Sequence, residues 1–154
     1  MFAKYLAVVF VAVAAVGCNP FSVGQKVAEA VERKALVDEC NELAAHPDRH
    51  LLATDMTYYD EGIINDYRQL SSVTVFNLTP HCAVTHAEGH VEWFDARGRS
   101  FGTTTFSLNK GVGAGGIATF KTADDSLSST IICGAATRSK LTFTSVDVVT
   151  PVGI

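Results

Sequence analysis

Three histidines and a cysteine lie within ten residues of one another, and their side chains are of the kinds that bind transition metals. These residues are His81, Cys82, His86 and His90. On a helix, Cys82, His86 and His90 would share a face. The sequence reads instead as a loop followed by a strand, on which four residues span about 13 Å, too far for one ion. We therefore expect no metal and no cofactor. The alternative to this expectation is a periplasmic protein that binds a metal or small ligand through His81, His86 and His90.

Other stretches contain residues that could bind phosphate or catalyse hydrolysis, but their sequence context favours structural roles. The glycine-rich run Gly111–Gly116 resembles a phosphate loop in composition, but a strand-like sequence follows it where a phosphate loop would open a helix. The adjacent carboxylates Asp60-Glu61 and Asp124-Asp125 are typical of solvated turns. The Gly-x-Ser-x-Gly motif of hydrolases is missing from the sequence. We predict that the protein is not an enzyme.

Composition narrows the class of partner. The chain has 154 residues and a formal net charge of −4, with no basic block. A surface that follows nucleic-acid phosphates needs clustered Lys and Arg, so nucleic acid is not an expected partner. The length after a signal segment suits a single domain.

The elements that position these residues divide the chain into two parts. Residues 18–24 contain Pro and Gly and suggest a tether. Residues 25–46 predict an α-helix, because they are rich in Ala, Glu, Lys and Leu and Pro47 follows them. We expect this helix to cover one face or end of a sheet.

Residues 47–154 predict a β domain. From Tyr67 onward, short alternating segments are separated by turn signals every 8–12 residues, a spacing typical of an antiparallel sandwich. Val91 and Trp93 share one parity of their segment, which predicts that the single tryptophan lies in the core. The predicted fold class is mainly β, an immunoglobulin-like antiparallel β-sandwich preceded by one N-terminal α-helix.

The first eighteen residues carry an export signal. Lys4 is followed by an apolar run, Tyr5–Val16, that is shorter than the roughly 20 residues needed to cross a bilayer. A cationic start, a short apolar core and small residues before a cleavage point are the plan of a secretory signal peptide.

The residues that close this segment, Ala15-Val16-Gly17-Cys18, resemble the lipobox of bacterial lipoproteins. The resemblance implies a signal peptide over residues 1–17 and a diacylated Cys18 as the first residue of the mature protein. An ordinary signal peptide cut nearby, or an uncleaved short anchor, are the alternatives. Asn19 is not the Asp that retains such proteins in the inner membrane of enteric bacteria, so the resemblance favours the outer membrane.

Three cysteines follow Cys18, and export places them where disulfides persist. We predict the pair Cys82–Cys133, because both lie in the β-rich part. A pair of Cys40 with either of them is the alternative. One thiol is left over in each case.

Part of the β domain resembles the FxLYD domain and related immunoglobulin-like modules of bacterial surface proteins. The resemblance rests on a strand ending in Asn (residues 73–77), a strand ending in an aromatic and Asp-x-x-Gly (residues 91–98), and a Gly-containing approach to a strand with Phe (residues 113–120). It implies a β-sandwich on the cell envelope without a shared active site.

These observations predict a lipid-anchored cell-envelope protein with a non-catalytic binding or structural role. Its expected location is the bacterial outer membrane, facing the periplasm or the surface. Its expected partners are the membrane, through Cys18, and another envelope protein.

Overall fold

The computed structural model describes residues 20–61, 67–134 and 136–150. The expected signal peptide and Cys18 lie outside these residues. The chain divides into two compact units, residues 1–37 and 38–154. Among the helices of the described part, none is both long enough and apolar enough to cross a membrane.

A long helix, α2 (Pro20–Ala45), begins in the first unit and ends in the second. It starts five residues earlier than Gln25, so most of the predicted tether is helical. Proline is well tolerated in the first turn of a helix, because its fixed φ suits that turn and its missing N–H would have no partner there. In the first unit, Val31 and Val37 are exposed.

The second unit contains a short helix and two β-sheets. The helix is α3 (Pro47–His50). The strands are β1 (Leu51–Glu61), β2 (Tyr67–Asn77), β3 (Ala83–Phe94), β4 (Ser100–Leu108), β5 (Ile117–Lys121), β6 (Leu127–Ser129), β7 (Ile132–Cys133) and β8 (Arg138–Val149). A 3-10 turn, η1 (Thr122–Asp124), joins β5 to β6.

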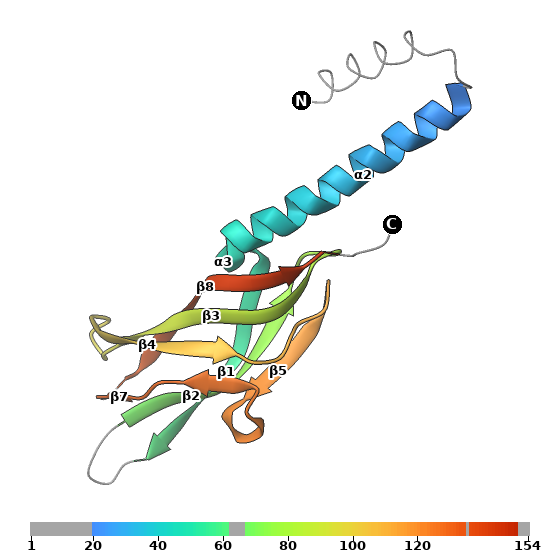
Figure 1. Ribbon diagram of the computed structural model, residues 1–154. Coiled ribbons are helices and arrows are strands. Elements are labelled where there is room, and N and C mark those ends of the chain that lie inside the picture. Colours follow the sequence, from blue (N-terminus) through green and yellow to red (C-terminus); the bar gives the residue numbers. More distant parts are fainter. Residues whose placement is uncertain (1–19, 62–66, 135, 151–154) are drawn as a thin grey trace. The chain divides into compact units, whose positions relative to one another are not determined.

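The strands form the predicted antiparallel sandwich (Figure 1). One sheet has the order β1-β2-β5, with β7 also paired to β2, and the other has the order β6-β4-β3-β8. Strands β1, β2 and β5 take the places of A, B and E of an immunoglobulin-like sandwich, and β8, β3 and β4 take those of F, C and C′. None of the described strands lies beyond β8, where strand G would pair.

Buried side chains alternate with outward-facing ones along β2 and β3, and the buried ones form the core. Val73 and Val75 of β2 are fully buried, as are Val91 and Trp93 of β3. The indole N–H of Trp93 donates to Thr104 Oγ1 at 2.8 Å, so its polar atom is satisfied inside the core. The prediction that Trp93 is a core residue is confirmed.

Some strands differ from the sequence prediction. Residues 51–61, which precede the alternating segments that begin at Tyr67, form the single strand β1. Its register with β2 shifts near Asp55, whose φ is +48°. Such a bulge hides a long strand from sequence reading, because it interrupts the alternation of side chains. The polar stretch 122–129 contains the short strand β6.

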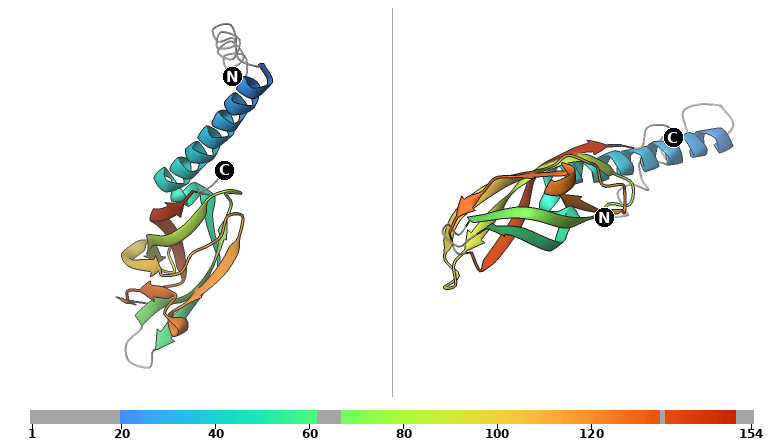
Figure 2. Two further views of the ribbon diagram at one scale, coloured as in Figure 1. Left: turned by 45° about the vertical axis from the view of Figure 1, so that its right-hand side comes forward. Right: turned by 90° about the horizontal axis from the view of Figure 1, so that it is seen from below.

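Two further views show how the two sheets face each other (Figure 2). The second unit also includes the end of α2 from Asp38 onward. Leu43 and Cys40 in this last part of the helix are buried with the sandwich core. The loop after β2 therefore lies against the end of α2, and this is where the predicted site residues meet.

Candidate functional site

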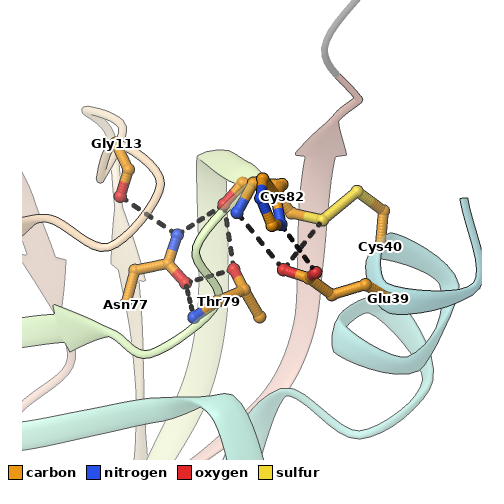
Figure 3. Close-up of a disulfide and its surroundings, with 7 residues drawn as sticks. Glu39, Cys40, Asn77, Thr79, Cys82 and Gly113 are labelled. Carbon is orange, nitrogen blue, oxygen red and sulfur yellow. Dashed lines mark hydrogen bonds and ion pairs between the residues drawn. A yellow bond between two sulfur atoms is a disulfide. The ribbon is translucent and has the colours of Figure 1, made fainter. Parts of the chain in front are cut away.

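A disulfide joins the end of α2 to the connection between β2 and β3 (Figure 3). Cys40 and Cys82 are bonded, with a Cα–Cα distance of 5.5 Å, and both side chains are buried. The predicted pair Cys82–Cys133 is wrong, and Cys133 is free and exposed. In the ladder between β7 and β2, Cys133 lies opposite Tyr67 at the start of β2, whereas Cys82 follows the end of β2. Ten residue steps along β2 separate its two ends, and hence Cys133 from Cys82, by roughly 30 Å.

The backbone of Cys82 is held by two buried polar side chains. Asn77 Nδ2 donates to the carbonyl of Cys82 at 2.7 Å and to that of Gly113 at 3.1 Å. Asn77 Oδ1 accepts from the backbone N–H and the hydroxyl of Thr79 at 3.1 and 2.6 Å. The Thr79 hydroxyl also lies 3.0 Å from the Cys82 carbonyl. Asn77 thereby links the end of β2, the Cys82 loop and the glycine-rich loop.

The glycine-rich loop Gly111–Gly116 connects β4 to β5. Val112 forms an isolated bridge with Val84 of β3. Gly115 has φ +59°, a conformation that favours glycine. Through the Val112 bridge and the Gly113 carbonyl that accepts from Asn77, the loop is hydrogen-bonded to β3 and to the end of β2.

His81, the first of the predicted metal-ligand candidates, pairs with the helix end. Its backbone N–H donates to Glu39 Oε1 at 3.2 Å, and its Nδ1 lies 3.0 Å from Glu39 Oε2. Glu39 Oε1 also lies 3.8 Å from Cys82 Sγ, a packing contact because a disulfide sulfur carries no hydrogen. The pair is partly exposed and joins the same two segments as the disulfide.

His86 and His90 lie on β3, facing away from the core. His86 Nε2 is 3.3 Å from Glu88 Oε1, two residues along the same strand. Within the described part of the chain, no three His, Cys, Asp or Glu side chains gather closely enough to hold a metal. The structure therefore separates the three histidines that the alternative hypothesis requires to act together.

Two carboxylates with shifted pKa values lie in turns. The backbone N–H of Arg99 lowers the pKa of Asp95 below its ordinary value of 3.8. The Ser126 hydroxyl, which donates to Asp124, lowers the pKa of Asp124 in the same direction. Asp95 also accepts from the backbone N–H of Arg97 and so shapes the turn between β3 and β4. Both are turn-forming carboxylates, as the sequence indicates for Asp124-Asp125.

The outer face of the second sheet carries a shallow polar hollow of about 440 Å³. Its lining is mostly hydroxyl side chains of β4, β6 and β8, together with Glu88 of β3. Several of these hydroxyls are already bonded within the protein; Ser129 Oγ, for example, donates to the Leu70 carbonyl at 2.8 Å. Sequence reasoning did not single out this hollow, because its residues come from four separate segments.

Comparisons with known proteins add little. No protein-family model matches this sequence, and no curated protein matches it. Among solved structures, the chain is similar to the X-ray structure of Northeast Structural Genomics Consortium target SoR45, with a TM-score of 0.36 and 11% sequence identity. The match covers 70% of this chain and 91% of that chain. This similarity is too low to establish a shared fold or function.

Proposed function

We propose that the protein is a bacterial lipoprotein of the cell envelope, anchored through Cys18, whose β-sandwich has a non-catalytic binding or structural role. In the anchoring step, the Cys18 thiol loses its proton and forms a thioether with the diacylglyceryl group of a phospholipid, whose phosphate-bearing headgroup leaves. Two acyl chains hold a protein stably on a membrane, whereas one holds it only marginally. The outer membrane is the proposed location.

The single observation that carries this proposal is the pairing of Cys40 with Cys82 behind an N-terminal segment typical of an export signal. Structural disulfides persist in oxidising compartments and are rare in the bacterial cytoplasm. The sequence signal and the disulfide thus support export independently, since one precedes the fold and the other lies within it.

The non-catalytic role is supported by what the candidate residues do in the fold. His81 and His86 lie in partly exposed pairs with neighbouring carboxylates. Asn77 and Thr79, the polar side chains buried beside the disulfide, direct their hydrogen bonds to the protein itself. His81, Asn77 and Thr79 stabilise the junction of the helix end and the sandwich, whereas His86 pairs within β3, and both arrangements suit a domain that presents a surface.

Metabolic labelling with radioactive palmitate tests the anchor. Wild-type protein should incorporate the label, and Cys18→Ala should lose both the label and the membrane association. Cys133→Ala is the matched control, because Cys133 is a free cysteine and is exposed. It should label as the wild type does. Globomycin, which blocks lipoprotein signal cleavage, should accumulate a larger precursor. If Cys18→Ala still labels and stays membrane-bound, the anchor is refuted.

A further inference from the structure

A carboxylate lies directly beside the Cys40–Cys82 disulfide (Figure 3). Glu39 precedes Cys40 in α2, and its Oε1 lies 3.8 Å from Cys82 Sγ. Cys40 and Cys82 are only 3% and 0% exposed, whereas the Glu39 side chain is 25% exposed. A reagent that approaches the disulfide from this side therefore meets the carboxylate before it reaches the sulfur.

The connection between β2 and β3 holds this carboxylate in place. His81 donates its backbone N–H to Glu39 Oε1 at 3.2 Å, and His81 Nδ1 lies 3.0 Å from Glu39 Oε2. Both carboxylate oxygens thus have a partner on the residue that precedes Cys82. Turning the Glu39 side chain away would break both contacts, so the charge is kept near the sulfur.

The charges around the disulfide are mostly negative. Residues 38–42, at the end of α2, contain three carboxylates and neither Lys nor Arg. The short helix α3 adds Asp48 and Arg49, and Arg49 pairs with Glu42 at 3.6 Å. His81 carries a positive charge only when it is protonated. An anion that approaches the disulfide here is therefore repelled, and negative charge that develops on its sulfurs is disfavoured.

Reduction of a disulfide by a thiol passes through such negative charges. A thiolate attacks one sulfur and forms a mixed disulfide with it, while the original S–S bond breaks and its electron pair leaves on the other sulfur as a new thiolate. A second thiolate of the reductant then displaces the first cysteine. Two reductant thiols are thereby oxidised to one disulfide, and both cysteines are reduced. The attacking and the departing sulfurs are both anionic, so a neighbouring carboxylate opposes the reaction at both.

We propose that Glu39, held by His81, slows reduction of the Cys40–Cys82 disulfide by anionic thiols through its charge. This effect acts in addition to burial, because Glu39 is the sequence neighbour of Cys40 and stays close to its sulfur when the helix end opens. The inference goes beyond the proposed envelope role, and it does not depend on lipid at Cys18.

Reduction kinetics of the full-length protein in detergent test the role of Glu39. Free thiols are first blocked with N-ethylmaleimide, and the thiols released by timed reduction are then counted with a mass tag. The reductants are thioglycolate, which carries a carboxylate, and cysteamine, which carries an ammonium group. Glu39→Gln should speed reduction by thioglycolate about fivefold, the factor for two unit charges roughly 4 Å apart in water. Reduction by cysteamine should change much less, because the ammonium group offsets the charge of the thiolate.

Comparing each variant with the wild type for each thiol cancels the reactivity of the thiol itself. Glu32→Gln is the matched control, because Glu32 is exposed on the same helix but lies in the first unit, and it should leave both rates unchanged. Equal acceleration with both thiols would mean that Glu39 acts through the stability of the fold, and it would overturn the inference. An unchanged rate with thioglycolate would overturn it as well.

Discussion

Removing the Cys40–Cys82 disulfide should destabilise the sandwich unit by about 4 kcal/mol. The sequence separation of the two cysteines is 42 residues. The chain-entropy relation for a closed loop of this size gives roughly 13 cal/mol/K, or about 4 kcal/mol at 25 °C. This is a large share of the 5–15 kcal/mol by which a typical domain is stable. For a unit of this size the melting temperature should fall by about 12–16 °C.

The measurement is urea unfolding of the double variant Cys40→Ala/Cys82→Ala, followed by circular dichroism and Trp93 fluorescence. Cys133→Ala is the control; its side chain is free and exposed, so its unfolding midpoint should match that of the wild type. Peptide mapping of the non-reduced protein should recover a fragment that joins the two segments containing Cys40 and Cys82. Recovery of a Cys82–Cys133 fragment would refute the assignment. So would destabilisation by Cys133→Ala with no effect of the double variant.

Three further substitutions and one control probe the fold. Asn77→Asp would replace a donor by a carboxylate oxygen facing two carbonyls, and it should cost about 2–3 kcal/mol at pH 7. Because burial raises the pKa of that new carboxyl in the folded state, the loss should shrink as the pH falls toward 4 in urea titrations at several pH values. Gly89→Ala should destabilise by at least about 2 kcal/mol in thermal melts, since a Cβ would collide with the Thr142 carbonyl and the Phe106 ring. Gly113→Ala, with open space, should not. Asp124→Asn should be less stable than the wild type at pH 7 and equally stable in acid. The lowered pKa of Asp124 contributes stability above its ordinary value of 3.8, and that stability disappears as the pH falls through the folded-state pKa. A difference that grows in acid would contradict this.

The fold class was predictable because alternation is a local property of the sequence. The inward positions of β2 and β3, such as Val73, Val91 and Trp93, follow directly from the two-residue period of a strand. The fold class followed from these short segments and their turn signals. The same residues meet in one hydrophobic core.

The disulfide could not be predicted in the same way. The three cysteines after Cys18 are consistent with more than one pairing, and the choice depends on which end of β2 each one approaches. Cys82 lies near Cys40 only because the buried end of α2 packs at the end of β2 marked by Asn77. That packing is a tertiary contact between segments 42 residues apart. The start of α2 was also missed, because Pro20 and Gly24 suggest a tether in sequence yet are accommodated near the start of a helix.

The position of β8 at the edge of its sheet was likewise beyond sequence reading. A strand reveals its alternation in sequence but not its position in the sheet, and only the order β6-β4-β3-β8 shows that β8 is at the edge. A sequence can therefore show the outward face of a strand before it shows which edge is open.

Mass spectrometry of the N-terminal peptide of the protein purified from membranes tests the central claim most directly. The account predicts a peptide that begins at Cys18 and carries the mass of a diacylglyceryl group on its sulfur, with or without an acyl group on its amine. A mature protein that begins elsewhere, or a Cys18 with an unmodified thiol, would contradict it.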